Sequence, residues 1–251
     1  MRNLKICIAY NGSNYHGWQR QNNNITVQQT VEDIMSRIMQ EKITAHGCSR
    51  TDAGVHAREF FLNAKTSSAI PCHGLMRAMN AMLPDDIAVL SCGDADEDFH
   101  ARFSAHGKEY EYIVNNAPQK DVFAKDMSLF YPYKLDEERL DKASKLFIGE
   151  HDFAAFCKAE AKEHLSSTVR KVYDFSVART GDTVRFRVSG SGFLHNMVRI
   201  MVGTLIYINE NKRTEEDIIN SLETGRRDTA GITVPPHGLY LNKVFYEEIK
   251  E

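Results

Sequence analysis

The sequence predicts an α+β protein with a large, mostly antiparallel sheet, built from two halves that each resemble a split βαβ unit. Strand-like segments alternate with amphipathic helical segments along the whole chain. The first half has the order β-α-β-β-α-β, followed by one more strand, and the second half repeats a similar order without a visible sequence repeat. A chain of 251 residues is long enough for one large domain or two small ones. We place the two halves at residues 1–115 and 116–251.

The first half begins with a strand at Leu4–Tyr10, which ends at the turn residues Asn11 and Gly12. Apolar residues at helical spacing follow Thr26, and Thr26 with Gln29 has the spacing of a capping box. These features predict an amphipathic helix. The remaining elements of this half are two strands, a helix that ends before Pro84, and two further strands: Ile43–Cys48, Val55–Lys65, His73–Met82, Ile87–Cys92 and Glu109–Val114.

The second half contains three predicted helices and three predicted strands. The turn Thr180–Asp182 separates two strands that alternate apolar and polar residues. In chain order the elements are a helix at Asp136–Phe147, strands at Val169–Ala178 and Thr183–Ser189, helices at Leu194–Ile208 and Glu215–Leu222, and a last strand at Leu239–Tyr246.

Composition excludes several classes of protein. Hydrophobic residues make up 42% and charged residues 26% of the chain, which is typical of an ordered protein. No run of about 18 apolar residues occurs, so we expect neither a signal peptide nor a membrane span, and a cytoplasmic location. The five cysteines lack a CxxC pair and predict reduced, mostly buried thiols. The net charge of −3 does not indicate nucleic-acid binding, although a local basic cleft stays open.

The segment His46–Ala57 is the most informative part of the chain. It places Arg50, Thr51, Asp52 and His56 around two glycines, which predicts a tight polar loop between apolar strands. From composition alone this loop could be an ordinary turn, in which Thr51 and Asp52 hydrogen-bond to the backbone.

The same segment resembles the ArgThrAspAlaGlyValHis signature of the tRNA pseudouridine synthase A family. The resemblance covers nearly the whole chain, in seven blocks that occur in the family's order. Besides the signature, these blocks are Tyr10–Gly12 with Tyr15–Gln21, Phe99–Ala105, Lys108–Tyr112, His151–Phe153, Gly192–Arg199 and Ala230–Leu241.

The resemblance implies a pseudouridine synthase fold, in which two ferredoxin-like or RRM-like halves share the sheet around a central RNA-binding cleft. It implies an isomerase that converts uridine to pseudouridine in the tRNA anticodon stem-loop, at positions 38, 39 and 40. It also implies a homodimer and a reaction that needs no cofactor, and the spacing of the histidines separately predicts no metal.

Carried over residue by residue, the resemblance makes Asp52 the catalytic carboxylate and Arg50 a neighbour that helps to extrude the target base. Tyr110 would stack on that base, and Arg199 would be the charge partner of Asp52. Ser49 departs from the glycine that is common in the family before this arginine, and since serine is also small we expect little change. Whether Asp52 attacks the sugar covalently or removes a proton stays open.

These residue types suit the reaction. A carboxylate in a closed pocket stays ionised when an arginine lies beside it. A base that leaves its stack is stabilised by an aromatic platform and by a side chain that fills the vacated space. The simpler alternatives are that Arg199 lies on the exposed side of its helix and that Tyr110 packs within the sheet.

Binding a folded RNA also requires contacts from lysine and arginine to phosphates. Arg20, Arg58, Arg102 and Lys108 are candidates because they lie in or beside the matched blocks, although each could be a solvated surface charge. Trp18 could serve packing or RNA stacking. The histidines lack the spacing of a metal site, so we expect them to hydrogen-bond in loops.

Three other functions compete with this prediction. One is a pseudouridine synthase that modifies another RNA or another position. Another is a non-catalytic RNA-binding module, which would have no reason to keep Asp52 beside Arg50. The third is a metal-dependent nuclease, which a chelator would inhibit.

Overall fold

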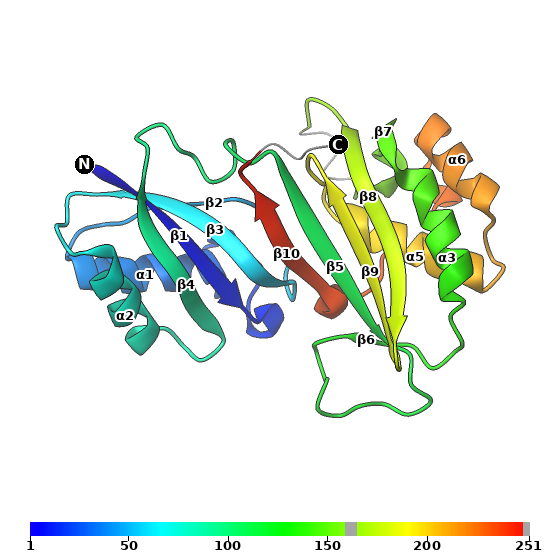
Figure 1. Ribbon diagram of the computed structural model, residues 1–251, viewed down its shortest axis with the longest axis horizontal. Coiled ribbons are helices and arrows are strands. Elements are labelled where there is room, and N and C mark those ends of the chain that lie inside the picture. Colours follow the sequence, from blue (N-terminus) through cyan, green and yellow to red (C-terminus); the bar gives the residue numbers. More distant parts are fainter. Residues whose placement is uncertain (159–164, 248–251) are drawn as a thin grey trace. The chain divides into compact units, whose positions relative to one another are not determined.

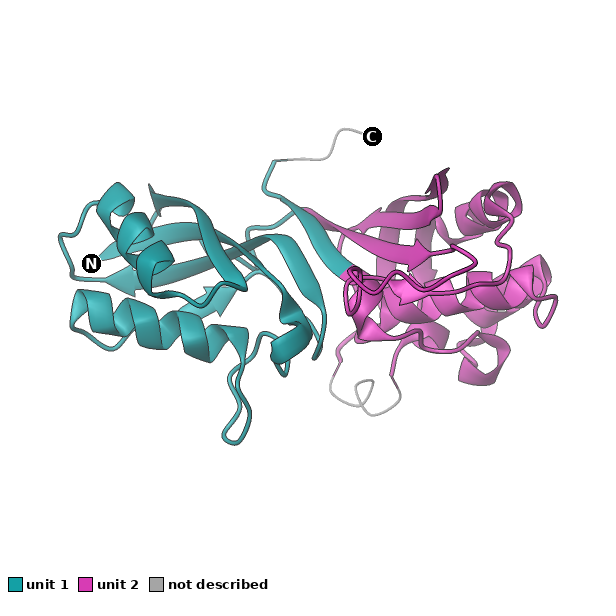
Figure 2. Ribbon diagram, turned by 90° about the horizontal axis from the view of Figure 1, so that it is seen from below, with its two compact units in different colours: residues 1–106, 240–251 teal, residues 107–239 magenta. Residues whose placement is uncertain are grey.

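A computed structural model describes residues 1–158 and 165–247. The chain forms two compact units: Met1–His106 with Tyr240–Glu251 is unit 1, and Gly107–Leu239 is unit 2 (Figure 2). This division differs from the predicted halves at both ends of unit 2. Strand β5 (Gly107–Asn115) groups with unit 2 because it pairs with β9 (Thr183–Gly190), and the last strand returns to unit 1 because it pairs with β3 (His56–Thr66).

Unit 1 contains every element predicted for the first half before β5. In chain order these are β1 (Arg2–Tyr10), α1 (Val27–Met39), β2 (Ala45–Gly47), β3, α2 (Cys72–Met82) and β4 (Ile87–Ala95). Strands β4, β1 and β3 are neighbours in that order and antiparallel, and β2 also pairs antiparallel with β3. Strand β10 (Leu239–Phe245) pairs with β3 in parallel, through Tyr240 and Leu241.

The core of unit 1 lies where α1 and α2 pack against these strands (Figure 1). Leu4, Ile6 and Ile8 alternate along β1 and are fully buried, as the period of two in a strand requires. Both helices bury apolar residues against them, and the N-cap of α1 is Thr26, whose side chain accepts a bond from the Gln29 amide at 3.4 Å. The structure therefore shows one of the two hydrogen bonds of the predicted capping box, the one that the Thr26 side chain accepts.

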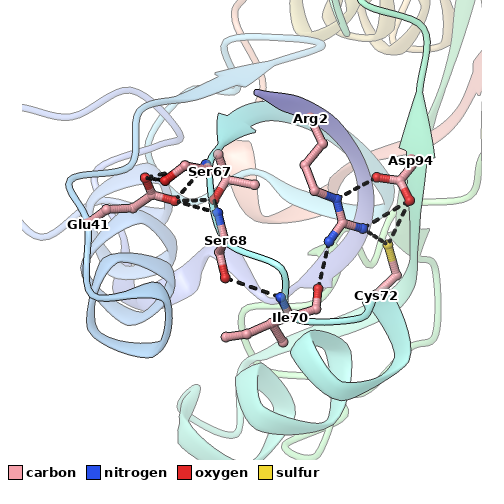
Figure 3. A network of polar contacts seen from close by, with 8 residues as sticks. Arg2, Glu41, Ser67, Ser68, Ile70, Cys72 and Asp94 are labelled. Atoms are coloured by element: carbon pink, nitrogen blue, oxygen red, sulfur yellow. Dashed lines mark hydrogen bonds and ion pairs between the residues drawn. The ribbon is translucent and has the colours of Figure 1, made fainter.

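A polar network fixes the connection between β3 and α2 (Figure 3). The Arg2 guanidinium pairs with Asp94 at 2.7 Å and donates to the Ile70 carbonyl and the Cys72 sulfur at 2.7 and 3.1 Å. On the other side the Glu41 carboxylate accepts bonds from Thr66, Ser67 and Ser68, which hold its pKa below the usual range. These bonds satisfy backbone groups that a loop would otherwise leave without partners.

Unit 2 contains four neighbouring strands in the order β5, β9, β8 (Val169–Thr180) and β7 (Gly149–Asp152), all antiparallel. A two-residue strand, β6 (Leu129–Phe130), pairs with β5 in parallel. The helices α3 (Glu137–Ser144), α5 (Met197–Asn209) and α6 (Glu215–Thr224) gather beside this sheet (Figure 1). The protein is therefore a mixed α+β structure with mostly antiparallel pairing, as predicted.

Helix α5 begins at Met197, three residues later than predicted, because Asn196 at its N-cap has a left-handed backbone with φ of 65°. The helix lies against the segment 230–234. A Cβ on Gly203 would stand 1.9 Å from the Ile232 carbonyl oxygen, so only glycine permits this approach. The Gly231 amide donates to the Thr204 hydroxyl at 2.8 Å and fixes the contact.

None of the helices in the described part of the chain is long and apolar enough to span a membrane. The cysteines stay as thiols, with Cys7, Cys48 and Cys157 buried and Cys72 and Cys92 partly exposed.

Candidate active site

The Asp52 loop, residues 48–55 between β2 and β3, is held by the N-terminal part of the chain. The Trp18 amide donates to the Thr51 carbonyl at 3.1 Å, and the Gly54 amide donates to the Tyr15 carbonyl at 3.3 Å. The hydroxyls of Tyr10 and Thr51 share a buried hydrogen bond of 2.8 Å. Two of the matched sequence blocks thus form one structural unit.

Glycines allow this close approach. Gly17 has φ of 83°, and a Cβ there would lie 2.5 Å from the Thr51 carbonyl oxygen. A Cβ on Gly12 would lie 2.0 Å from the carbonyl oxygen of Val55. Neither position can take a side chain without moving the loop.

Asp52 occupies the turn of this loop, where its carbonyl accepts a bond from the Val55 amide at 3.2 Å. Gly54 follows with φ of 76°. The backbone is therefore the ordinary turn that composition favours. The Asp52 side chain is partly exposed, and backbone hydrogen bonds at Thr51 and Gly54 hold the loop on either side of it.

His56 follows the loop at the start of β3 and is buried. Its Nδ1 accepts the Gly12 amide at 3.1 Å, and its ring stacks on Tyr240 with centroids 4.6 Å apart. The Arg58 guanidinium lies over the Tyr240 ring, 4.8 Å from its centroid. It also donates a hydrogen bond to the Asn242 side chain at 2.7 Å. Among the described residues, no three His, Cys, Asp or Glu side chains gather as metal ligands.

Trp18 serves packing. Its ring is buried and stacks on Phe60 with centroids 4.1 Å apart, and a Cβ on Gly47 would lie 2.6 Å from the indole. The indole also forms part of the wall of a cavity of about 220 Å³ beside the Asp52 loop. The residues lining that cavity are Trp18, Gln19, Gln28, Ala45, His46, Gly47, Ser49, Arg50, His100, Arg102 and Phe103.

Two of the predicted arginines, Arg50 and Arg102, line this cavity and are exposed. Arg20, in contrast, pairs with Asp33 at 2.5 Å and with Glu32 at 3.3 Å on α1. An RNA phosphate would have to compete with these carboxylates for Arg20.

Tyr110 of unit 2 lies on β5, buried, with its ring edge-to-face to Phe193 at 5.2 Å. Tyr112 lies on the same face and is fully buried, and its hydroxyl donates to the Pro235 carbonyl at 2.8 Å. Burial raises the pKa of Tyr112 well above its usual range. Tyr112 is thus a packing residue, whereas Tyr110 lies beside a loop aromatic.

Arg199, in the first turn of α5, is partly buried rather than on an exposed face. Its Nε donates to the Val234 carbonyl and its Nη1 to the Asn196 side chain, both at 2.8 Å. These bonds unite the blocks Gly192–Arg199 and Ala230–Leu241. Lys108, at the start of β5 opposite Gly190, is partly exposed.

Sequence reasoning missed several residues around these sites. Asn196 and Val234 orient the Arg199 side chain, and Phe193 packs on Tyr110. In unit 1 His46 and Phe103 line the cavity beside Arg50. A left-handed asparagine before a helix and an exposed phenylalanine have no distinct signal in a single sequence.

Comparison with known proteins gives one consistent result. The family model described as tRNA pseudouridine synthase matches residues 6–104 and 143–247. Proteins named tRNA pseudouridine synthase A from Clostridium botulinum (strain Eklund 17B / Type B) and Thermoanaerobacter sp. (strain X514) are 43% and 42% identical to the chain. Each alignment covers 98% of this chain and the whole of the relative. A protein of the same name from Acetivibrio thermocellus is 42% identical over the same share.

Proposed function

The chain belongs to the tRNA pseudouridine synthase family and is an isomerase that acts on tRNA, and from this we propose that it forms pseudouridine in the anticodon stem-loop, at positions 38, 39 and 40, with Asp52 as its catalytic carboxylate. The observation that carries the proposal is the Asp52 loop. The N-terminal matched block holds this loop through two backbone hydrogen bonds and the bond between the Tyr10 and Thr51 hydroxyls, and Asp52, the only acidic residue of the loop, is partly exposed.

The reaction breaks the bond between C1′ of the ribose and N1 of the base, turns the base, and forms a bond from C1′ to C5. The C5 proton is then lost and N1 gains one, so no oxidant, reductant or transferred group is required. Asp52 either attacks the sugar or removes a proton from it. In both routes it must be ionised, and a rigid loop reduces the cost of placing it.

The other predicted residues have roles that follow from their chemistry. Arg199 would pair with Asp52 and keep the carboxylate charged. Tyr110 would stack on the target base, and Arg50 would fill the space that the base leaves. The hydrogen bonds of Arg199 to Val234 and Asn196 support its role as the charge partner of Asp52, because they fix the direction of the guanidinium before any ligand binds.

The wider architecture of the proposal has two ferredoxin-like or RRM-like halves, which share a large sheet around an RNA-binding cleft. The strand order β4, β1, β3, β2 within unit 1 supports it. Arg58, Arg102 and Lys108 would contact phosphates, and Arg20 would do so only by giving up its carboxylate partners on α1. We further propose a cytoplasmic homodimer that works without cofactor or metal.

Mapping pseudouridine in an unmodified tRNA transcript tests this function. We expect the purified protein to modify positions 38, 39 or 40 in the presence of a chelator, and Asp52→Asn to modify none. Modification elsewhere would favour a synthase with another target. Binding without any product would favour a non-catalytic module, and chelator-sensitive cleavage would favour a nuclease.

A further inference from the structure

The cavity beside Arg50, here called the Phe103 pocket, carries features that the catalytic roles above do not use. We propose that it binds one unpaired nucleotide of the tRNA, with the base stacked on Phe103 and the phosphate held by Arg102. This inference rests on the proposed function and adds a second contact to the RNA, distinct from the target uridine. The pocket lies wholly within unit 1.

Phe103 presents an aromatic ring to solvent. The residue is 76% exposed, although an apolar ring of this size is usually buried. The His100 ring lies 4.4 Å from it at 37°, and the His46 ring lies 5.2 Å from His100. Such a row of rings beside cationic groups is the arrangement that binds bases of single-stranded nucleic acids, because every base has a π face.

The platform is rigid before any ligand binds. The Ser104 amide donates to the His100 carbonyl at 2.9 Å, and the His100 amide donates to the Ser104 hydroxyl at 3.1 Å. The buried Ala101 is bonded through its amide to Asn63 and through its carbonyl to Tyr246. Little backbone entropy is therefore lost around Phe103 when a base stacks on it.

The pocket is positively charged although the chain is acidic overall. Its described lining contains Arg50 and Arg102 and no Asp or Glu. Within residues 1–158 and 165–247 neither guanidinium is in an ion pair, and Arg102 lies 5.7 Å from the Phe103 ring. Arg20, on the same unit, is neutralised by α1. Arg102 thus keeps its charge available for a phosphate, and Arg50 adds to the positive charge of the pocket.

The size of the pocket suits a single base. Its volume of about 220 Å³ is enough for one ring system. Arg50 stands two residues before Asp52, so their Cα atoms are at most about 7 Å apart and the pocket lies close to the candidate catalytic carboxylate. Gln19 also lines the pocket, and its side-chain amide can offer both a donor and an acceptor to a base edge.

The test compares Phe103→Ala, Phe103→Tyr and a matched control, Phe123→Ala, which removes a 95% exposed phenylalanine from unit 2. We expect Phe103→Ala to raise the Kd for an unmodified tRNA transcript about tenfold, and its KM in a C5-tritium release assay by a similar factor. The kcat should change less than twofold. Phe103→Tyr, which keeps the aromatic face, and Phe123→Ala should bind like the unaltered protein.

Two further measurements separate the contribution of base stacking to tRNA binding from that of the phosphate contact. Arg102→Gln should reduce the slope of log Kd against log salt by about one, while Phe103→Ala should leave that slope unchanged. In anticodon stem-loop RNAs with single abasic sites, one position should abolish the penalty of Phe103→Ala, because base and ring form a coupled pair. That position identifies the nucleotide in the pocket.

The pocket and the proposed function fail in different ways. If the unaltered protein releases tritium and Phe103→Ala binds tRNA equally well, the pocket does not hold a nucleotide. The same holds if the penalty persists with every abasic RNA. If the unaltered protein neither binds tRNA nor releases tritium, the proposed function itself is wrong.

Discussion

Two histidines beside the Asp52 loop use Nδ1 as an acceptor. His56 accepts the Gly12 amide, and His100 accepts the Arg102 amide, both at 3.1 Å. A nitrogen that accepts carries no proton, so each ring is neutral with its proton on Nε2. For His100 burial lowers the pKa, and His46 and Arg102 lower it further through repulsion.

Replacing His46 tests this electrostatic description. In His46→Gln the repulsion from the second imidazole is gone, so we expect the pKa of His100 to rise towards its ordinary value. Burial would still hold it below that value. An NMR titration of the ring protons measures the change. An unaltered pKa would mean that His46 contributes nothing.

The lowered pKa of His100 also makes the stability of the folded state depend on pH. The folded state binds this proton less well than the unfolded state, so the contribution of His100 to stability is present above its unfolded pKa. That contribution is lost as the pH falls through the folded pKa. Denaturation between pH 7 and pH 5 should therefore show a smaller loss of stability in His46→Gln than in the unaltered protein.

The candidate site could be predicted from sequence only where residue identity is itself the signal. The tight polar loop was predicted because its segment is dense in polar residues and glycine, whereas the choice of Asp52 as the catalytic carboxylate came from the family resemblance and stays a prediction. The pairing of Arg20 with α1 could not be seen, since Asp33 and Glu32 lie twelve to thirteen residues away on a helical face. The exposure of Phe103 depends on how the chain around it folds, which composition does not encode.

At the scale of elements, helix α5 depends on a glycine at its closest approach to the segment 230–234. That segment carries the Val234 carbonyl, which accepts the Arg199 Nε, so the packing of Gly203 and the direction of Arg199 are linked.

Gly203→Ala should destabilise the protein by about 1–3 kcal/mol, because its Cβ would overlap the Ile232 carbonyl. Gly74→Ala on α2 is the matched control. Its Cβ would meet only an Ile70 methyl at 3.8 Å, so the change should stabilise by roughly 0.4–1 kcal/mol through reduced freedom of the unfolded chain. Urea denaturation measures both. Equal effects in the two variants would contradict the packing described for α5.

The order of elements was predictable because each long helix and strand has its own periodicity. Strands β6 and β7 were missed because two and four residues are too short for a period to appear. The boundary between units was placed differently because β5 and β10 take their partners from distant parts of the chain, and pairing of that kind has no local signal.

At the scale of the molecule, unit 1 contains both ends of the described chain. Lys5 of β1 lies 4.0 Å from the ring of Tyr246, which follows β10, and also faces the rings of Phe61 and Phe99. The Tyr246 hydroxyl donates to the Ala101 carbonyl at 2.8 Å, on the segment that carries Phe103. The C-terminal strand is thus part of the structure that supports the Phe103 pocket.

Tyr246→Ala should lower the free energy of unfolding by about 2–3 kcal/mol, since the ring contacts and the hydrogen bond are both lost. Tyr246→Phe keeps the ring and should cost only about 1 kcal/mol. Hydrogen exchange should quicken in β1 and β3 of unit 1 and stay unchanged in β8 and β9 of unit 2. Faster exchange throughout the chain would show that the two units do not respond separately.

The most direct test of the central claim measures tritium release from C5-labelled uridine in an unmodified tRNA transcript. It compares the unaltered protein with Asp52→Asn and with Asp85→Asn, an exposed carboxylate of the same unit. Tritium leaves only when C5 loses its proton. We predict release by the unaltered protein and by Asp85→Asn, and none by Asp52→Asn even though it still binds the RNA. Release by Asp52→Asn at the unaltered rate would contradict the assignment of Asp52 as the catalytic carboxylate.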